Sequence, residues 1–205
     1  MIKTINQNAT AEIVVKKSKF IANLFYVETE NEAREILSGV NEKYNDAKHN
    51  CYAYIIKEIN ESDIIQVQKS SDNGEPSRTA GAPLLDLLKK QGLSNVLVVV
   101  TRYFGGILLG TGGLVKAYTE SASKALFKTD IVTKEIGNLY EIVVEYSDLN
   151  NIEHNAESIG YRIKEIEYGE SVKIRVLSTE DKFKELTKVC NNINNKSIKE
   201  KRLWI

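Results

Sequence analysis

The chain has 205 residues, of which 42% are apolar and 27% charged, and its 28 basic and 28 acidic residues give a formal net charge of zero. A chain of this length can bury a substantial core and form two small domains, and the composition is ordinary for a soluble globular protein. The charge is balanced in each half of the chain, which excludes the strong basic excess of a nonspecific nucleic-acid binder. Any contact with RNA would therefore depend on a local patch.

The two cysteines, Cys51 and Cys190, are far apart and do not suggest a disulfide framework or a four-ligand zinc site. Thiols kept reduced in the cytoplasm are the simpler interpretation. The N-terminal residues lack the apolar region of a signal peptide, and no stretch approaches the length of a transmembrane helix. We therefore expect a cytoplasmic protein with no membrane partner, no metal ion and no cofactor.

Apolar patterning in the first part of the chain predicts four strands, over residues 11–15, 19–27, 51–57 and 64–69. Thr29 and Glu32 have the spacing of a capping box, in which the Thr29 hydroxyl accepts from the amide of Glu32 and the Glu32 carboxylate accepts from the amide of Thr29. Apolar residues at helical spacing continue to Tyr44 and predict a helix. A second helix is expected from Pro83, which suits a first turn, to Gly92.

The most distinctive stretch is VLVVVTRYFGGILLGTGGLVK, residues 96–116. Its first five residues are apolar, as in a strand buried on both faces, and the chain turns polar at Thr101. A helix is expected from about Gly113 to Phe127. Five of the chain's 12 glycines fall within nine positions, at Gly105, Gly106, Gly110, Gly112 and Gly113. Such clustering indicates unusual backbone angles or a close approach to another group.

Two interpretations of this glycine-rich segment remain open. Exposed amides at the start of the following helix, with Lys116 one turn in, would suit an anion. The plainer alternative is a tight packing corner between a strand and a helix. The segment is not a known nucleotide-binding loop, because Thr111 and Gly112 follow where a P-loop requires Lys and Ser or Thr. Val115 likewise stands in place of the third glycine of the dinucleotide-binding pattern.

The second part of the chain is expected to begin after a linker at residues 131–136, so that the domains are 1–130 and 137–205. A strand over 139–146 precedes a helix that is capped by Ser147 or Asp148 and closed by Gly160. A hairpin then joins 161–168 to 171–177 through a type II′ turn at Gly169. A helix capped by Ser178 or Thr179 and a final strand over 199–204 follow, and the cluster Lys196, Lys199, Lys201 and Arg202 is interpreted as a solubilising edge.

The first domain is expected to be α+β, because runs of strands precede the helices, and a doubly wound parallel sheet is not expected. The order of elements in the second domain, β-α-β-β-α-β, is ferredoxin-like.

Four residues before the glycine-rich segment could carry chemistry. His49 and Cys51 could be a catalytic pair, but residues two apart in a strand lie roughly 6.6 Å apart along the chain, too far for a thiol–imidazole hydrogen bond without a bend. We expect a polar His49 on the site-facing side of the sheet and a semi-buried Cys51. Asp72 and Glu75 could be acid/base groups or metal ligands, and the favoured alternative is turn formation by Asp72 and solvation of Glu75.

Arg78 and Arg102 lie at the edges of irregular segments that can converge, and arginine suits bidentate recognition of phosphate. With Lys116, Tyr103 and the glycine amides, they would form one cationic patch with an aromatic plate. No residue is expected to be catalytic. The candidate ligand-binding residues are His49, Glu75, Arg78, Thr79, Arg102, Tyr103, Gly105, Gly106, Gly110, Thr111, Gly112, Gly113 and Lys116.

Three blocks in this order resemble the IMPACT/YigZ family: DAKHNCYAY at residues 46–54, DNGEPSRTAGAP at 72–83 and VVVTRYFGGILLGTGGLVKAY at 98–118. The sequence departs from the family at Arg78, where a small residue, commonly glycine, is usual. The resemblance covers roughly residues 1–130 and implies the fold of the second domain of a small-subunit ribosomal protein. The remainder is similar to the smaller C-terminal domain of bacterial members, and its ferredoxin-like order resembles the last domain of elongation factor G.

The resemblance also implies a role in translation, because eukaryotic IMPACT proteins regulate the pathway that controls initiation. The hypothesis is a non-catalytic binding protein that contacts RNA, the ribosome or a translation-related protein, with a phosphate-bearing or acidic ligand at the motif-bearing surface. One alternative is an enzyme acting on a small phosphorylated molecule, with His49 or Glu75 transferring a proton. The other is a protein-interaction scaffold without a nucleic-acid role.

Overall fold

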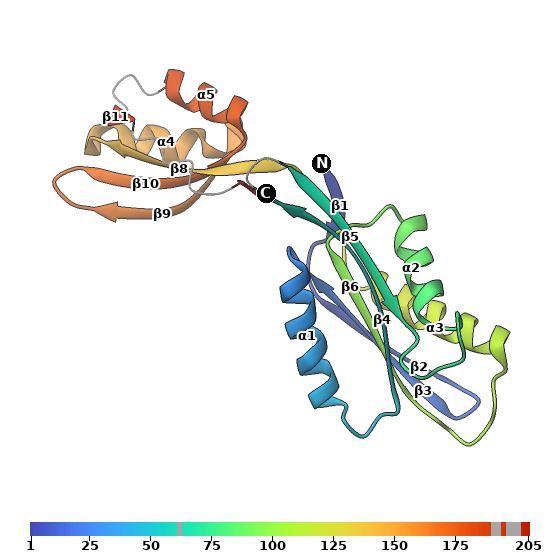
Figure 1. Ribbon diagram of the computed structural model, residues 1–205. Coiled ribbons are helices and arrows are strands. Elements are labelled where there is room, and N and C mark those ends of the chain that lie inside the picture. Colours follow the sequence, from blue (N-terminus) through green and yellow to red (C-terminus); the bar gives the residue numbers. More distant parts are fainter. Residues whose placement is uncertain (61–62, 190–193, 196–201) are drawn as a thin grey trace. The chain divides into compact units, whose positions relative to one another are not determined.

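The computed structural model describes residues 1–60, 63–189, 194–195 and 202–205 (Figure 1). The chain divides into two compact units, one of residues 2–133 and one of residues 134–205 together with Met1. Both units combine helices with antiparallel strands, so the predicted mixed α+β class with two domains is confirmed.

The first unit is built on a five-stranded sheet in the order β2-β3-β6-β4-β5, and every neighbouring pair in it is antiparallel. Its strands are β2 (Ala9–Val15), β3 (Ser18–Tyr26), β4 (His49–Ile59), β5 (Ile64–Ser71) and β6 (Val96–Tyr103). The apolar run at residues 96–100 is thus the centre of the sheet, and all five of its residues are buried. The strand extends past this run to Tyr103, beyond the point where the sequence turns polar.

Helices cover both faces of this sheet, α1 (Glu30–Lys43) on one and α2 (Gly81–Lys90) with α3 (Thr111–Leu126) on the other (Figure 1). Alternate residues of β6 enter two separate cores. Val98 and Val100 pack on the side of α2 and α3, whereas Leu97 and Val99 pack on the side of α1. A strand that is covered on both faces has no solvent-facing positions, which explains the continuous apolar run.

The capping box before α1 forms with one changed partner. Thr29 is the N-cap, and its hydroxyl accepts from the amide of Glu32 at 3.1 Å, as predicted. The Glu32 carboxylate, however, accepts from the amide of Glu28 at 2.7 Å and not from that of Thr29. The Glu32 carboxylate therefore fixes Glu28, the residue before the N-cap.

The segment predicted to be a linker is regular structure. Ile131–Lys134 forms β7, which pairs with β1 (Ile2–Ile5), a strand that the sequence pattern did not predict. The next strand begins at Ile136. The boundary between the two units, after Thr133, falls within the predicted linker, but the segment is regular because β1 and β7 satisfy each other's backbone groups, a pairing that no local pattern reveals.

The second unit has the predicted β-α-β-β-α-β order. It contains β8 (Ile136–Val144), α4 (Tyr146–Ile159), β9 (Arg162–Tyr168), β10 (Val172–Ser178), α5 (Glu180–Val189), β11 (Asn194–Asn195) and β12 (Arg202–Trp204). The sheet order is β11-β8-β10-β9, and β12 also pairs with β8, so two short strands share the edge position beside β8.

Two details of this unit differ from the sequence prediction. The N-cap of α4 is Glu145, so Ser147 and Asp148 lie within the first turn. Gly160 ends that helix in the left-handed region, with φ of 81°, as predicted. Gly169 lacks the positive φ that a type II′ turn requires, and a longer connection, residues 169–171, joins β9 to β10. Of the predicted C-terminal features, Cys190, Lys196, Lys199 and Lys201 lie outside the described residues.

Candidate functional site

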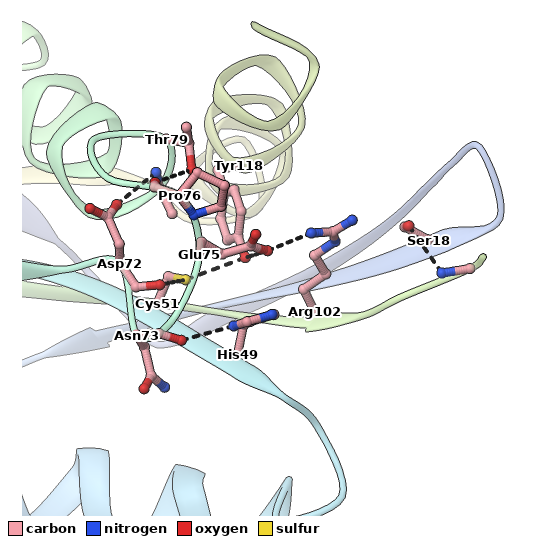
Figure 2. A network of polar contacts seen from close by, with 12 residues as sticks. Ser18, His49, Cys51, Asp72, Asn73, Glu75, Pro76, Thr79, Arg102 and Tyr118 are labelled. Carbon is pink, nitrogen blue, oxygen red and sulfur yellow. Dashed lines mark hydrogen bonds and ion pairs between the residues drawn. The ribbon is translucent and has the colours of Figure 1, made fainter. Parts of the chain in front are cut away.

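The family-like blocks meet on the side of the sheet that faces α2 and α3. His49 at the start of β4 lies directly opposite Arg102 near the end of β6 in the register of the two strands. The loop between β5 and α2, residues 72–80, lies against this pair, and Tyr118 approaches from α3 (Figure 2). Strand pairing thus brings together residues that are far apart in the sequence.

Asp72 organises the loop. Its Oδ2 accepts from the amide of Arg78 at 2.7 Å, and its Oδ1 accepts from the amides of Ala80 at 2.9 Å and Gly81 at 2.8 Å. Ala80, the N-cap of α2, has no side-chain oxygen, so Asp72 caps this helix from outside it. Burial raises the pKa of Asp72, but the backbone hydrogen bonds outweigh burial and hold the pKa below its usual value.

We expect Asp72→Asn to lower the free energy of unfolding by about 2 kcal/mol at pH 7, because an amide cannot supply both charged acceptors. The pKa of Asp72 is lower in the folded protein than in the unfolded chain, where it is near 3.8, so the ionised carboxylate stabilises the protein at pH values above 3.8. This contribution is lost as the pH falls through the folded-state pKa. The free energies of unfolding of wild type and Asp72→Asn, measured by urea denaturation, should therefore become similar at acidic pH. Asp86→Asn, at an exposed position on the same helix, is the control. An equal loss in both variants would contradict the capping role.

Glu75 is buried, so the expectation that it is solvated is wrong. Its Oε1 lies 2.6 Å from Nη1 of Arg102, and the two side chains are only 3% and 7% exposed. The hydroxyl of Tyr118 donates to the same oxygen at 2.8 Å. A carboxylate is tolerated in this environment because a cation and a second donor compensate for its lost hydration.

Arg102 is held by the protein on several sides. Its guanidinium carbon lies 5.5 Å from the ring centroid of Phe20 and 5.4 Å from that of Phe104. Its Nε is buried and has no hydrogen-bond partner among the residues that the structure describes. Because Glu75 neutralises its charge, Arg102 differs from the surface arginine expected to grip a phosphate.

His49 and Cys51 are not a catalytic pair. Nδ1 of His49 lies 2.8 Å from the carbonyl oxygen of Asn73, and the Cys51 sulfur lies 2.9 Å from that of Asp72 and 3.3 Å from the Tyr118 hydroxyl. Burial raises the pKa of Cys51 to about 12, so the thiol stays protonated at neutral pH and is a poor nucleophile. Cys51 is fully buried, whereas the sequence suggested partial burial.

The remaining cationic and aromatic candidates do not join this network. Tyr103 follows Arg102 in a strand, so it lies on the opposite face, where its hydroxyl donates to Asp46 at 2.7 Å. Lys116 is exposed, and a spacing of two residues places it on the side of α3 away from the inward-facing Tyr118. The side chain of Arg78 is exposed. The predicted single cationic patch with an aromatic plate is therefore wrong.

Two other positions in the loop before α2 have local roles. Thr79 is buried, and its hydroxyl donates to the carbonyl of Pro76 at 2.6 Å. Arg78 has φ of 64°, in the left-handed region that glycine occupies most readily. This chain therefore holds an arginine there at a conformational cost.

The two ends of the glycine-rich segment differ. A Cβ on Gly105 would lie 2.0 Å from the carbonyl carbon of Lys17, and the Gly105 amide donates to Oγ of Ser18 at 3.1 Å, so this end is a packing corner. Gly106 and Gly110 have positive φ angles of 83° and 73°. At the other end, Gly110 is the N-cap of α3 and has no side chain to cap the amides of Thr111, Gly112 and Gly113. Thr111 and Gly112 are exposed.

Sequence reasoning missed two features of this region. One is Tyr118, which lies among the small buried residues of α3 and completes the network. The signal was available, because a tyrosine buried on a helix face needs an acceptor for its hydroxyl. The other is a set of exposed apolar side chains, with Phe104 51%, Ile107 41% and Leu108 81% exposed. The sequence analysis interpreted the neighbouring glycines as an anion site and did not consider these apolar side chains.

Within the described ranges, no group of three or more His, Cys, Asp or Glu residues is placed to hold a metal ion. No helix in that part of the chain is both long and apolar enough to cross a membrane.

This combination of a strand–glycine–helix motif with a buried acid–arginine–tyrosine network coincides with a known domain. Residues 16–126 match the Impact N-terminal domain, and residues 142–188 match a domain of unknown function, DUF1949. The chain belongs to the IMPACT family.

Two bacterial relatives are named as members of the same family, and one solved structure has a similar fold. The chain is 37% identical to the IMPACT family member YvyE of Bacillus subtilis over 94% of this chain and 86% of that protein. It is 36% identical to the IMPACT family member YigZ of Escherichia coli over 79% and 78% of the two chains. A crystal structure of a hypothetical protein matches with a TM-score of 0.64 and 33% identity over 91% of this chain and 89% of that one.

Proposed function

We propose that this protein is a non-catalytic binding protein of the cytoplasm that acts in translation or its regulation, and that residues 104–113 contact a protein component of the translation apparatus. Family membership supports the role in translation. The predicted likenesses to a ribosomal protein domain and to the last domain of elongation factor G belong to the same proposal, although a fold by itself does not specify function.

The observation that carries the choice of partner is the exposure of Phe104, Ile107 and Leu108 in one short segment. Clustered apolar side chains at a protein surface mark sites of interaction with other proteins, where they become buried anchors. The uncapped first turn of α3 follows directly, and its amides suit a carboxylate of the same partner. Apolar anchors beside exposed amides favour a protein partner that carries both apolar and acidic groups.

The charges argue against RNA as the direct partner. The charge of Arg102 is neutralised by Glu75 within the protein, and Lys116 lies on the outer side of α3. RNA binding at a phosphate surface requires several free cations and becomes much weaker as salt is raised. A contact that rests on apolar side chains has no such dependence.

Co-sedimentation of the purified full-length chain with bacterial ribosomes tests this proposal. Leu108→Ser should reduce binding about tenfold or more, because a leucine buried in an interface contributes roughly 1.5–3 kcal/mol. Phe127→Ser is the matched control, since this side chain is 90% exposed just past the other end of α3. Binding should persist after nuclease treatment and change little between about 50 and 200 mM salt.

Two results would overturn the proposal. Nuclease-sensitive binding that weakens steeply with salt and with Lys116→Gln, but not with Leu108→Ser, would replace the protein partner with RNA. A wild-type chain that binds neither ribosomes nor any translation factor from the ribosome-free supernatant would contradict the role in translation.

A further inference from the structure

Strand β5 is an open edge of the first sheet. The sheet order ends at β5, which pairs on one side only, with β4. All of its residues, Ile64–Ser71, pair with β4 without a shift in register, so the strand is continuous and has no bulge. Within the ranges that the structure describes, no other group bonds to the backbone of β5. Its outward-facing N–H and C=O groups are therefore a template for another strand.

Two other edge strands of this chain carry protections that β5 lacks. The ammonium of Lys128 donates to the carbonyl of Thr10 on β2, the opposite edge of the same sheet. β9, at the edge of the second sheet, has a register shift against β10. Four of its seven residues are also charged, namely Arg162, Lys164, Glu165 and Glu167. β5 has one charged residue, Lys69, and no proline or bulge, so the usual barriers to edge pairing are nearly absent.

The same edge exposes apolar side chains. Ile64 and Ile65 are 42% and 50% exposed. Val67 is half-buried against the core beneath α1, and Ile65 shares this face because alternate residues of a strand point the same way. α1 packs on β4 and β6, which leaves Ile65 and Val67 partly uncovered. A strand added beside β5 would cover both side chains.

We propose that β5 pairs antiparallel with β5 of a second copy of this chain, across a two-fold axis through Val67. Directly opposed residues of an antiparallel pair lie on the same face of the sheet. Val67 is then opposite Val67 of the second copy, and Ile65 is opposite Lys69. No residue of β5 faces a like charge in this register, and both copies use the same surface, as a two-fold interface requires.

Charge complementarity favours a second copy as the occupant. Glu58 on β4 is directly opposite Ile65, and in the dimer Lys69 of the second copy lies on the other side of the same Ile65. Glu58 and Lys69 are then two strand spacings apart, roughly 9.6 Å, and their long side chains can meet above Ile65. Among the described residues of one chain, neither forms an ion pair, and the two-fold axis repeats the contact. β5 shares no residue with segment 104–113, so either proposal can fail without the other.

Sedimentation equilibrium of the full-length chain between about 1 and 100 µM should show a dimer. Ile65→Lys puts a lysine opposite Lys69 of the second copy and should weaken dimerisation at least about tenfold. Adding Lys69→Glu makes the opposed pair attractive and should restore part of the affinity. Val14→Lys is the matched control, because Val14 is 64% exposed on β2 and should leave the dimer unchanged. Circular dichroism should show that all variants fold.

A cysteine on the axis tests the register. Val67→Cys should form a disulfide between two chains under mild oxidation, since Cβ atoms of directly opposed residues lie about 4.5–5.5 Å apart. Val14→Cys should not, and wild type controls for the native cysteines. The proposal is overturned if wild type is monomeric at about 100 µM, or if Ile65→Lys dimerises as tightly as wild type. Cross-linking of Val67→Cys no greater than that of Val14→Cys would also overturn it.

Discussion

Glu75→Ala is expected to lower the free energy of unfolding of the first unit by about 3–5 kcal/mol, because it leaves the buried Arg102 cation without its counter-charge. The hydroxyl of Tyr118 loses its acceptor in the same change. Chemical denaturation followed by circular dichroism measures the effect. The single tryptophan, Trp204, lies in the second unit, so its fluorescence should report a transition that the substitution leaves in place.

Glu120→Ala is the matched control for the Glu75 prediction. Glu120 pairs with Lys124 at 3.4 Å, but these two side chains are 43% and 54% exposed, so the change should stay within about 0.5 kcal/mol of wild type. Replacing both buried partners, in Glu75→Leu with Arg102→Met, should recover part of the loss, because no charge is then left unpaired. Equal losses in Glu75→Ala and Glu120→Ala would show that the buried pair has no special role.

Gly105→Ala should destabilise the first unit by about 3 kcal/mol or prevent its folding. The added Cβ would lie 2.0 Å from the carbonyl carbon of Lys17 and 2.4 Å from the amide nitrogen of Ser18. Both are backbone atoms, at the end of the turn between β2 and β3 and at the start of β3, so no side-chain rotation relieves the contact. The substitution must instead separate this turn from the segment that follows β6. The thermal midpoint of the first unit measures the loss.

Gly112→Ala tests whether the effect at Gly105 arises from steric contact or from glycine content alone. Gly112 lies in the first turn of α3, and a Cβ there has no atom within 4 Å. Alanine is more favourable than glycine in a helix, so this variant should be as stable as wild type or more stable by up to about 1 kcal/mol. If Gly105→Ala and Gly112→Ala melt together, the packing-corner interpretation is incorrect.

Local sequence patterns predicted the elements of both units more accurately than their contacts. The apolar run at 96–100, the Thr29 cap and the left-handed Gly160 each depend on residues within a few positions of one another, so a local pattern contains the cause. The strand within the predicted linker segment was missed for the opposite reason. Ile131–Lys134 is a strand because β1, more than a hundred residues earlier, pairs with it.

The candidate site was predicted in part. Placing His49 beside Arg102 required two separated blocks to meet, and the register of β4 and β6 brings them together. The separation of Arg102 from Tyr103 follows from strand alternation, but only once the strand is known to continue through Tyr103. The polar residues at 101 and 102 suggested that the strand ended there. The sequence analysis therefore did not place Arg102 and Tyr103 on opposite faces of the sheet.

By itself, the sequence determined most of the strands and helices, that the chain makes two mixed α+β units, and that it resembles the IMPACT family, because these depend on short-range preferences and recognisable motifs. Only the tertiary structure decided that Glu75 turns inward to neutralise Arg102, and that Lys116 and Tyr103 lie away from them. It also showed that the motif segment exposes apolar side chains, and that β5 is an open edge of the first sheet. Burial and charge pairing depend on which distant surfaces pack together, and that information is not contained in any one segment of the chain.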